Sequence, residues 1–210
     1  CSIGSSAAAP GEGKSAVSMD LAAAAASLGG RVILIEADFR KPVFAERLGI
    51  AAAPGLSETL AGGISRTEVT SPITVPVGFG ESADPSFDVI PCGGTPPNPQ
   101  QLLESKGMTA LLDELAAKYD LVIIDTPPVL QVPDAIPMVR LVDGVVVVCR
   151  SETSTRHQLQ LILEEIAELD GNVLGIAFNG IKRKRHGYGY GYGYGYGDSK
   201  AEEGKKLFGA

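Results

Sequence analysis

Residues 8–15 read AAPGEGKS and stand between a short segment that opens the chain, which we interpret as a strand, and a long alanine-rich segment that we interpret as a helix. The stretch fits the phosphate-binding pattern G-x-x-x-x-G-K-[ST], except that Ala8 replaces the first glycine. Gly11 and Gly13 can adopt backbone angles that turn successive N–H groups inward. Those donors, together with the N-terminus of the following helix, can hold a phosphate group. The stretch therefore predicts a strand–loop–helix unit that binds a nucleotide.

Each residue of this loop has an expected part in binding. The backbone from Pro10 through Glu12 to Gly13 would surround the β-phosphate of a nucleotide. Lys14 would bridge oxygens of the β- and γ-phosphates, and the Ser15 hydroxyl would ligate Mg²⁺. We therefore expect ATP and Mg²⁺ as cofactors.

Short apolar runs alternate with helical patterns along the rest of the chain. Continuous apolar runs of this length are typical of strands buried on both faces, and their alternation with helices indicates a parallel sheet. The fold class is therefore α/β, a doubly wound and mostly parallel sheet with helices on both faces. Buried strands are expected at 31–36, 121–125, 144–149 and 172–178, a further strand at 87–91 inside a mostly loop region (71–98), and helices at 15–28, 100–119 and 155–169.

Two further turns place acidic residues directly after apolar runs. VILIEADFRKP (32–42) carries Glu36, Asp38 and Arg40, and LVIIDTPP (121–128) carries Asp125. The carboxyl ends of parallel strands form the ligand crevice of a doubly wound sheet. Asp125 and Asp38 could hold Mg²⁺ there, and Glu36 could accept a proton from an attacking hydroxyl. The alternative is that these acids cap the helices that follow.

Charge and composition divide the chain at about residue 181. The net charge is −7, yet residues 182–210 hold seven Lys/Arg and three Asp/Glu, a balance of +4, and the remainder has a balance of −11. We expect a domain over 1–181 and a basic, Gly/Tyr-rich flexible tail over 182–210. No apolar run is long enough to span a bilayer, and three cysteines without metal-ligand spacing indicate reduced cytosolic thiols. The chain opens with Cys1 instead of Met, which we interpret as an N-terminally truncated domain.

The tail holds nearly all of the phenol groups in the chain. Residues 187–198 read GYGYGYGYGYGD, and Tyr119 is the one tyrosine outside this run. Glycine at every second position gives too much chain entropy for the tail to order alone. That flexibility suits a substrate, and we interpret the tyrosines as phosphate acceptors. The acceptors would be Tyr188, Tyr190, Tyr192, Tyr194 and Tyr196.

Taken together, these motifs resemble the bacterial tyrosine kinases of capsule and exopolysaccharide export. AAPGEGKS resembles their Walker A motif, ILIEADFRKP their second acidic motif and LVIIDTPP their Walker B motif. GLSETLAGG (55–63), PCGGTPPNPQQLLES (91–105) and DAIPMVRLVDGVVVV (134–148) match as well. The sequence departs from the family at Glu36, where Asp is usual, at Ala8, where Gly is usual, and at Asp20, where Asn is usual.

The resemblance implies an ATP-dependent protein-tyrosine autokinase at the cytoplasmic face of the cell membrane, active in exopolysaccharide or capsule synthesis. Lys14, Glu36, Asp38 and Asp125 would be catalytic, and Asp38 and Asp125 would join Ser15 around the metal. Implied partners are further subunits in a ring, a membrane polysaccharide co-polymerase or activator segment (fused or separate), and a tyrosine phosphatase. From the sequence itself, Arg40 would position phosphate or a partner's tail, and Asn179 would contact adenine.

Other functions stay open on sequence grounds. One alternative is a P-loop ATPase or a regulator of polysaccharide chain length that binds ATP without phosphorylating tyrosine. The related partitioning ATPases carry a second lysine early in the loop, where this chain has Ala9. Another alternative is a non-enzymatic module that recruits partners through the Gly-Tyr tail. Nucleic-acid binding through residues 182–186 is disfavoured by the acidic domain.

Overall fold

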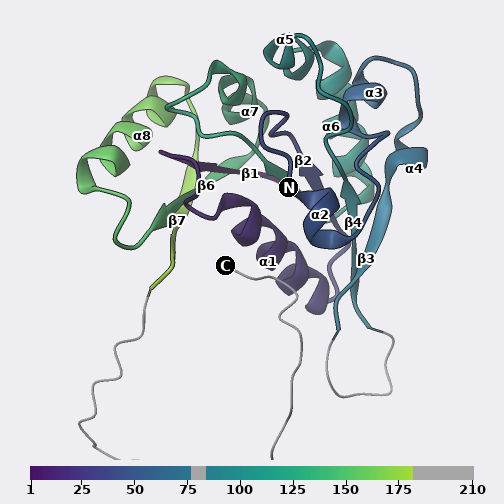
Figure 1. Ribbon diagram of the computed structural model, residues 1–210, viewed down its shortest axis with the longest axis horizontal. Helices are drawn as coiled ribbons and strands as arrows, with labels where there is room; N and C mark the ends of the chain where they lie inside the picture. The colour runs from purple at the N-terminus through teal and green to yellow at the C-terminus, as the bar shows by residue number, and fades with distance from the viewer. Residues whose placement is uncertain (77–83, 182–210) are drawn as a thin grey trace, which may run out of the picture.

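A computed structural model describes residues 1–76 and 84–181, and the tail lies outside the described residues. Within these ranges seven strands form one sheet in the order β3-β4-β2-β5-β1-β6-β7 (Figure 1). All neighbours pair in parallel except β3 and β4. The strands are β1 (Ser2–Ala7), β2 (Val32–Glu36), β3 (Ser71–Thr74), β4 (Ser86–Ile90), β5 (Leu121–Asp125), β6 (Gly144–Arg150) and β7 (Val173–Asn179). The predicted fold class is confirmed.

Helices cover both faces of this sheet. Figure 1 shows α1 on one face and α6, α7 and α8 on the other. Met19 and Ala22 of α1 pack with Leu34 and Ile123, and Leu115 of α6 packs with Ile33 on the opposite face. The helices are α1 (Lys14–Ser27), α2 (Phe44–Leu48), α3 (Leu56–Leu60), α4 (Arg66–Val69), α5 (Pro99–Leu103), α6 (Lys106–Lys118), α7 (Ile136–Leu141) and α8 (Arg156–Glu168), with a short 3₁₀ turn η1 (Pro133–Ala135) before α7.

Register brings the functional ends of three strands together. Asp125 at the end of β5 pairs with Glu36 of β2 on one side and with Ser5 of β1 on the other. The loop after β1 is the phosphate-binding stretch, so it leaves the sheet beside Asp125. The parallel topology therefore places three predicted motifs at one carboxyl edge.

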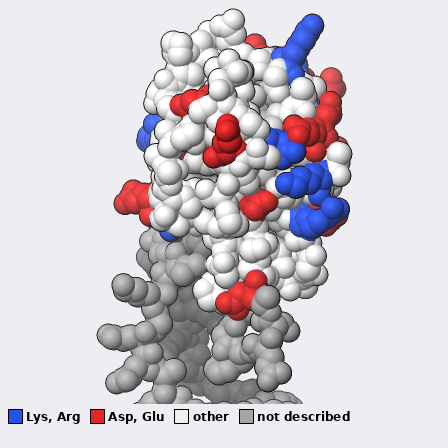
Figure 2. Space-filling model, turned by 90° about the vertical axis from the view of Figure 1, so that its right-hand side faces the viewer, with Lys and Arg blue, Asp and Glu red and all other residues white. Residues whose placement is uncertain are grey.

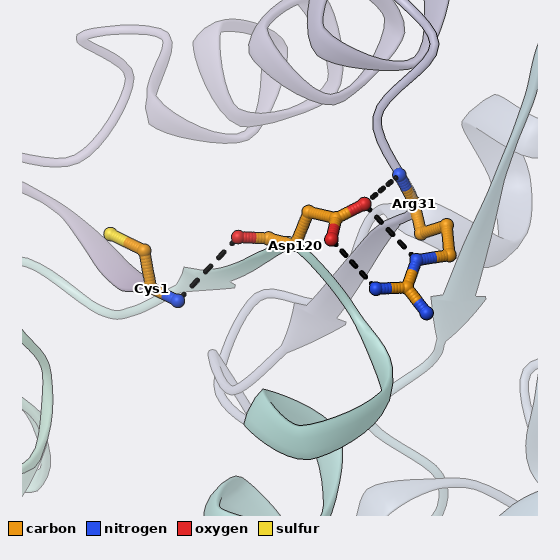
Figure 3. Close-up of polar contacts among 3 residues, drawn as sticks. All are labelled: Cys1, Arg31 and Asp120. Atoms are coloured by element: carbon orange, nitrogen blue, oxygen red, sulfur yellow. Dashed lines mark hydrogen bonds and ion pairs between the residues drawn. The ribbon is translucent and has the colours of Figure 1, made fainter.

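An exposed ion pair lies at the amino-terminal ends of the strands, opposite the carboxyl edge. Arg31 donates to Asp120 from its backbone nitrogen, from Nε at 3.1 Å and from Nη2 at 2.7 Å (Figure 3). The backbone nitrogen of Cys1 donates to the Asp120 carbonyl oxygen at 3.5 Å. The side-chain hydrogen bond from Arg31 is the main reason why the pKa of Asp120 is lowered to about 2. The starts of β1, β2 and β5 are thus tied together far from the phosphate loop.

Two details of the predicted layout were wrong, and one strand was not predicted. The single helix expected at 100–119 is two helices, α5 and α6, because the Ser105 Oγ accepts a hydrogen bond from the Met108 N–H and starts a new helix. A strand, β3, occupies part of the region expected to be mostly loop. The strand expected to be buried at 172–178 lies at the edge of the sheet as β7, where alternate residues are exposed. No helix in the described ranges is long and apolar enough to cross a membrane.

Candidate active site

A cavity of about 460 Å³ opens at the carboxyl edge of the sheet beside the phosphate loop. Its walls come from the loop, the turn after β2, the turn after β5, and the ends of β6 and β7. Five basic and two acidic side chains contribute to the walls, which suits an anionic ligand. The charged lining residues are Lys14, Asp20, Asp38, Arg40, Lys41, Arg47 and Arg150.

The phosphate loop has the backbone that its glycines predicted. Gly11 has φ 82° and Gly13 has φ 93°, in the left-handed region that glycine tolerates best. A Cβ at Gly13 would lie 2.0 Å from the Asn179 Nδ2, so that position has no room for a side chain. Helix α1 begins directly afterwards at Lys14, and its first N–H groups face the cavity edge where an anion can bind.

Asp125 lies beneath the loop and accepts hydrogen bonds from serine hydroxyls, among them Ser15 of the predicted metal site. The Ser15 Oγ donates to its Oδ2 at 2.5 Å, and the Ser5 Oγ donates to its Oδ1 at 3.0 Å. Burial raises the pKa of the Asp125 carboxyl, and the nearby Lys14 ammonium and the Ser15 hydroxyl oppose that rise. A buried carboxylate held against a hydroxyl and a lysine is costly unless it serves a cation.

Asp38 reaches the same cavity from the turn after β2. Its Oδ1 accepts hydrogen bonds from the backbone N–H groups of Arg40 and Lys41, both at 3.1 Å. The negative charge of Asp38 also contributes to the raised pKa of Asp125, so the two carboxylates act on one another electrostatically. Oxygen ligands from two acids and one hydroxyl fit the preference of Mg²⁺, which retains several waters and phosphate oxygens. Among the described residues, no group of three or more His, Cys, Asp or Glu could hold a metal ion by itself, so a bound cation here would depend on the hydroxyl, water and phosphate oxygens as well.

Glu36, the predicted base, stands at the end of β2 and is held by backbone N–H groups. Its Oε1 accepts from the backbone N–H groups of Val43 at 2.5 Å and Phe44 at 2.9 Å, and its Oε2 accepts from Cys92 N–H at 3.2 Å. The side chain is buried and is not among the residues that line the cavity. Burial raises the pKa of this carboxyl, and the three backbone donors oppose the rise.

Glu12 and Asn179 hold the loop in shape. Glu12 is buried and turned inward, with Oε2 accepting from Ala9 N–H at 2.9 Å and Oε1 accepting from the Ser154 hydroxyl. The Asn179 Nδ2 donates to the Glu12 carbonyl oxygen at 3.2 Å while Asn179 also lines the cavity. The loop is thereby tied to the ends of β6 and β7.

Arg150 is a site residue that the sequence reasoning missed. It ends β6, lines the cavity, and donates from Nη1 to the Gly11 carbonyl oxygen at 3.0 Å. The rule that located Asp125, a charged residue at the end of an apolar run, would also have located Arg150. The predicted positions that line the cavity are Pro10, Gly11, Gly13, Lys14, Ser15, Asp38, Arg40 and Asn179, whereas Glu12, Glu36 and Asp125 do not line it. Asp125 meets the cavity through its hydrogen bond with Ser15, which does line it. The five tail tyrosines lie outside the described residues.

Comparison with known proteins agrees with this geometry. No protein-family model matches the chain. The tyrosine-protein kinase YwqD of Bacillus subtilis is 36% identical over 177 residues, which cover 84% of this chain and 71% of YwqD. The tyrosine-protein kinase Wzc of Salmonella typhi is 37% identical over 172 residues, which cover 82% of this chain and 22% of Wzc. The chain therefore spans less than a quarter of such longer relatives.

Solved structures give the same result. The kinase domain of the Escherichia coli tyrosine kinase ETK matches with a TM-score of 0.78 at 35% identity, over 91% of this chain and 72% of that one. A cobyrinic acid a,c-diamide synthase from Mycobacterium smegmatis, solved with ADP and magnesium, has a TM-score of 0.65 at 18% identity, which shows a shared fold alone. With the likeness to YwqD extending over most of both chains, this chain belongs to the bacterial tyrosine-protein kinase family.

Proposed function

We propose that this chain is an ATP-dependent tyrosine autokinase domain, spanning 1–181, whose substrate is the tyrosine cluster of the 182–210 tail. The observation that carries the proposal is the hydrogen bond from Ser15 to the buried Asp125, directly beneath a glycine loop that opens on a basic cavity. This arrangement has the groups that a phosphoryl transfer needs: backbone donors, a lysine, and oxygen ligands for a divalent cation.

In the proposed reaction, a tyrosine oxygen attacks the γ-phosphorus of ATP in line with the bond to the bridging oxygen. That bond breaks, ADP leaves, and the phenol proton passes to a base. Lys14 and the loop N–H groups would stabilise the charge on the phosphate oxygens. Ser15 and Asp125 would hold Mg²⁺, which would supply further neutralisation of that charge. Asp38, predicted as a third metal ligand, is instead proposed for the proton transfer.

The base was predicted to be Glu36, but we now favour Asp38 for this role. Both oxygens of Glu36 are occupied by backbone donors, and the Glu36 side chain does not line the cavity. Asp38 lines the cavity, and two backbone N–H groups fix its orientation through one of its oxygens. A general base must come within hydrogen-bond reach of the proton that it removes, and position supports Asp38.

The proposal extends to the setting of the kinase. We expect the domain to work in a ring of subunits at the cytoplasmic face of the membrane, with a membrane co-polymerase or activator segment. A tyrosine phosphatase would reverse the modification, and the role would be control of exopolysaccharide or capsule synthesis. The resemblance of the motifs and the family membership support these proposals.

Mass spectrometry of the chain tests the proposed activity. A phosphatase-treated sample is incubated with MgATP, beside Lys14→Met and a control, Lys106→Met, which changes an exposed lysine outside the cavity. We expect phosphate on Tyr188 to Tyr196 in the wild type and in the control, and none in Lys14→Met. If free phosphate accumulates while the tail stays unmodified, even with a membrane-partner segment supplied, the chain is an ATPase and the proposal is wrong.

A further inference from the structure

Strand β7 exposes large apolar side chains at every second position. Leu174 is 50% exposed, Ile176 47% and Phe178 57%, while the residues between them are partly covered. Because successive side chains of a strand point to opposite faces, the exposed residues share one face. Contiguous apolar surface of this kind marks an interaction site more often than scattered single residues do.

The same strand also ends the sheet. Among the described residues β7 pairs with β6 on one side and forms the edge on the other. The opposite edge is formed by β3, a shorter strand that contains Pro72, which has no N–H to offer another strand. Figure 2 shows that side of the molecule, where acidic and basic side chains lie beside one another on a largely uncharged surface. Charges and proline discourage pairing at an edge, whereas β7 has seven residues, none of them charged or proline.

The sequence that follows β7 has the matching period. Glycine and tyrosine alternate strictly over 187–197, starting eight residues after β7 ends at Asn179. In an extended strand, this alternation places all five tyrosines on one face and glycines on the other. Tyrosine has high strand propensity and presents a large apolar ring, and aromatic–β-branched cross-strand pairs stabilise sheets.

We propose that the unphosphorylated tail docks on its own domain as an additional antiparallel strand beside β7, with its tyrosines over the exposed apolar face. In one such register Phe178 lies opposite Tyr188, Ile176 opposite Tyr190 and Leu174 opposite Tyr192. Asn179 ends β7, and residues 180–187 form the connection. So short a connection gives the tail of the same chain a high effective concentration at β7, which favours it over another molecule's tail.

The repeat makes this docking tolerant of register. A shift by two residues exchanges one tyrosine for the next and keeps every ring on the same face, whereas a shift by one would place glycines there. Phosphorylation adds about −1.5 to −2 charges to each ring, which opposes packing on apolar side chains. The docked tail is therefore a resting state that phosphorylation prevents from re-forming. This consequence rests on the proposed kinase function, while the docking itself does not.

Disulfide trapping in the full chain tests the docking without ATP. In a phosphatase-treated Cys1→Ser background, Ile176→Cys is combined with Tyr190→Cys or, as the matched control, with Gly191→Cys; the remaining native thiols, Cys92 and Cys149, are buried. We expect the pair with Tyr190→Cys to form an intrachain disulfide at least about tenfold faster than the pair with Gly191→Cys. In a docked strand, position 191 would point its Cβ to the face opposite Ile176→Cys. Equal rates at the two tail positions would overturn the proposed strand, and a disulfide-linked dimer would overturn docking on the same chain.

Hydrogen exchange gives a second readout that needs no cysteine. Replacing all five tail tyrosines with serine removes the apolar rings and keeps the chain length. We expect the amides of β7 to exchange about tenfold faster or more in this variant than in the wild type, since the docked strand would protect them. Unchanged exchange would contradict docking. Both experiments omit nucleotide, so their outcome is independent of the phosphorylation measured with MgATP. A tail that docks but is never phosphorylated would refute the kinase proposal alone. A tail that is phosphorylated but never docks would refute this inference alone.

Discussion

Glu36 and Asp125 sit opposite one another at the ends of neighbouring strands, yet their surroundings differ completely. They pair in register across β2 and β5, both are buried, and burial raises the pKa of both carboxyls. Asp125 accepts bonds from the hydroxyls of Ser5 and Ser15, whereas Glu36 accepts bonds from three backbone N–H groups. One carboxylate therefore faces the ligand-binding loop, and the other fixes the turn that leads into α2.

This difference teaches that a carboxylate at a strand end is not by itself a catalytic group. Hydroxyl partners such as Ser15 can exchange a hydrogen bond for a metal ion, so Asp125 can serve a ligand without leaving a donor unpaired. Backbone N–H groups have no such freedom, and removing Glu36 from them would leave buried donors unsatisfied. The variants below separate these two roles, with the largest expected effect first.

Asp125→Asn should reduce tail phosphorylation by roughly 10²–10³-fold, because it removes charge from the proposed metal site. The change is nearly isosteric, so we expect the far-ultraviolet circular dichroism spectrum to stay that of the wild type. The rate of phosphotyrosine formation with MgATP is the measurement, and Asp113→Asn on the exposed face of α6 is the control. A rate within threefold of the wild type would remove Asp125 from the site.

Glu36→Ala should destabilise the fold by about 3 kcal/mol or more, since three buried N–H groups would lose their acceptor. Urea unfolding measures this, with Glu46→Ala in α2 as the control at an exposed position. Glu36→Gln keeps one acceptor oxygen, and we expect it to retain phosphorylation within about threefold of the wild type where the protein stays folded. A folded Glu36→Gln as inactive as Asp125→Asn would restore Glu36 as the base.

The thermal stability of Asp125→Asn should depend on pH in a defined direction. A carboxyl whose folded pKa is raised binds protons more tightly in the native state, so the wild type loses stability as the pH rises from the ordinary value near 3.8 through the raised folded value. Asparagine has no such penalty. We expect Asp125→Asn to melt about 2–4 °C higher than the wild type at pH 7, and the advantage to vanish near pH 4. A variant that melts lower at pH 7 would show that the charge stabilises the fold.

Arg31→Ala, at the amino-terminal ends of the strands, should have the smallest effect on activity and stability. Its ion pair with Asp120 is exposed, and exposed pairs contribute little to stability. We expect unchanged phosphorylation, and a rise in the pKa of Asp120 from about 2 toward its ordinary value. Titration of the Asp120 carboxyl by nuclear magnetic resonance checks this shift. A clear loss of kinase activity would contradict this expectation, because it would mean that the ion pair at the amino-terminal ends of the strands affects the cavity at their carboxyl ends.

Much of the fold could be predicted because its signals are local. Apolar runs gave the strands, and the strand–loop–helix pattern at 8–15 fixed where the cavity lies. Since parallel strands share a carboxyl edge, the order of elements alone brings Lys14, Asp38 and Asp125 together. The prediction of one helix over 100–119 failed at Ser105, where a single capping hydroxyl divides the helical pattern into α5 and α6.

Other features depended on contacts between distant segments. One of the three backbone donors that hold the Glu36 side chain is Cys92, which lies 56 residues away in the sequence. The exposure of β7 follows from its place at the end of the sheet, which its apolar sequence does not reveal, because an edge strand and a central strand can have the same composition. Arg150 does end an apolar run, but its hydrogen bond with Gly11 joins segments 139 residues apart, and no local pattern indicates that contact.

The most direct test of this account is calorimetric titration with ADP, with and without Mg²⁺, on the wild type, Asp125→Asn and Glu36→Gln. The account predicts that Mg²⁺ strengthens ADP binding to the wild type and to Glu36→Gln, and that this gain is lost in Asp125→Asn. The opposite pattern, in which Glu36→Gln loses the gain and Asp125→Asn keeps it, would contradict the division of roles between the two carboxylates.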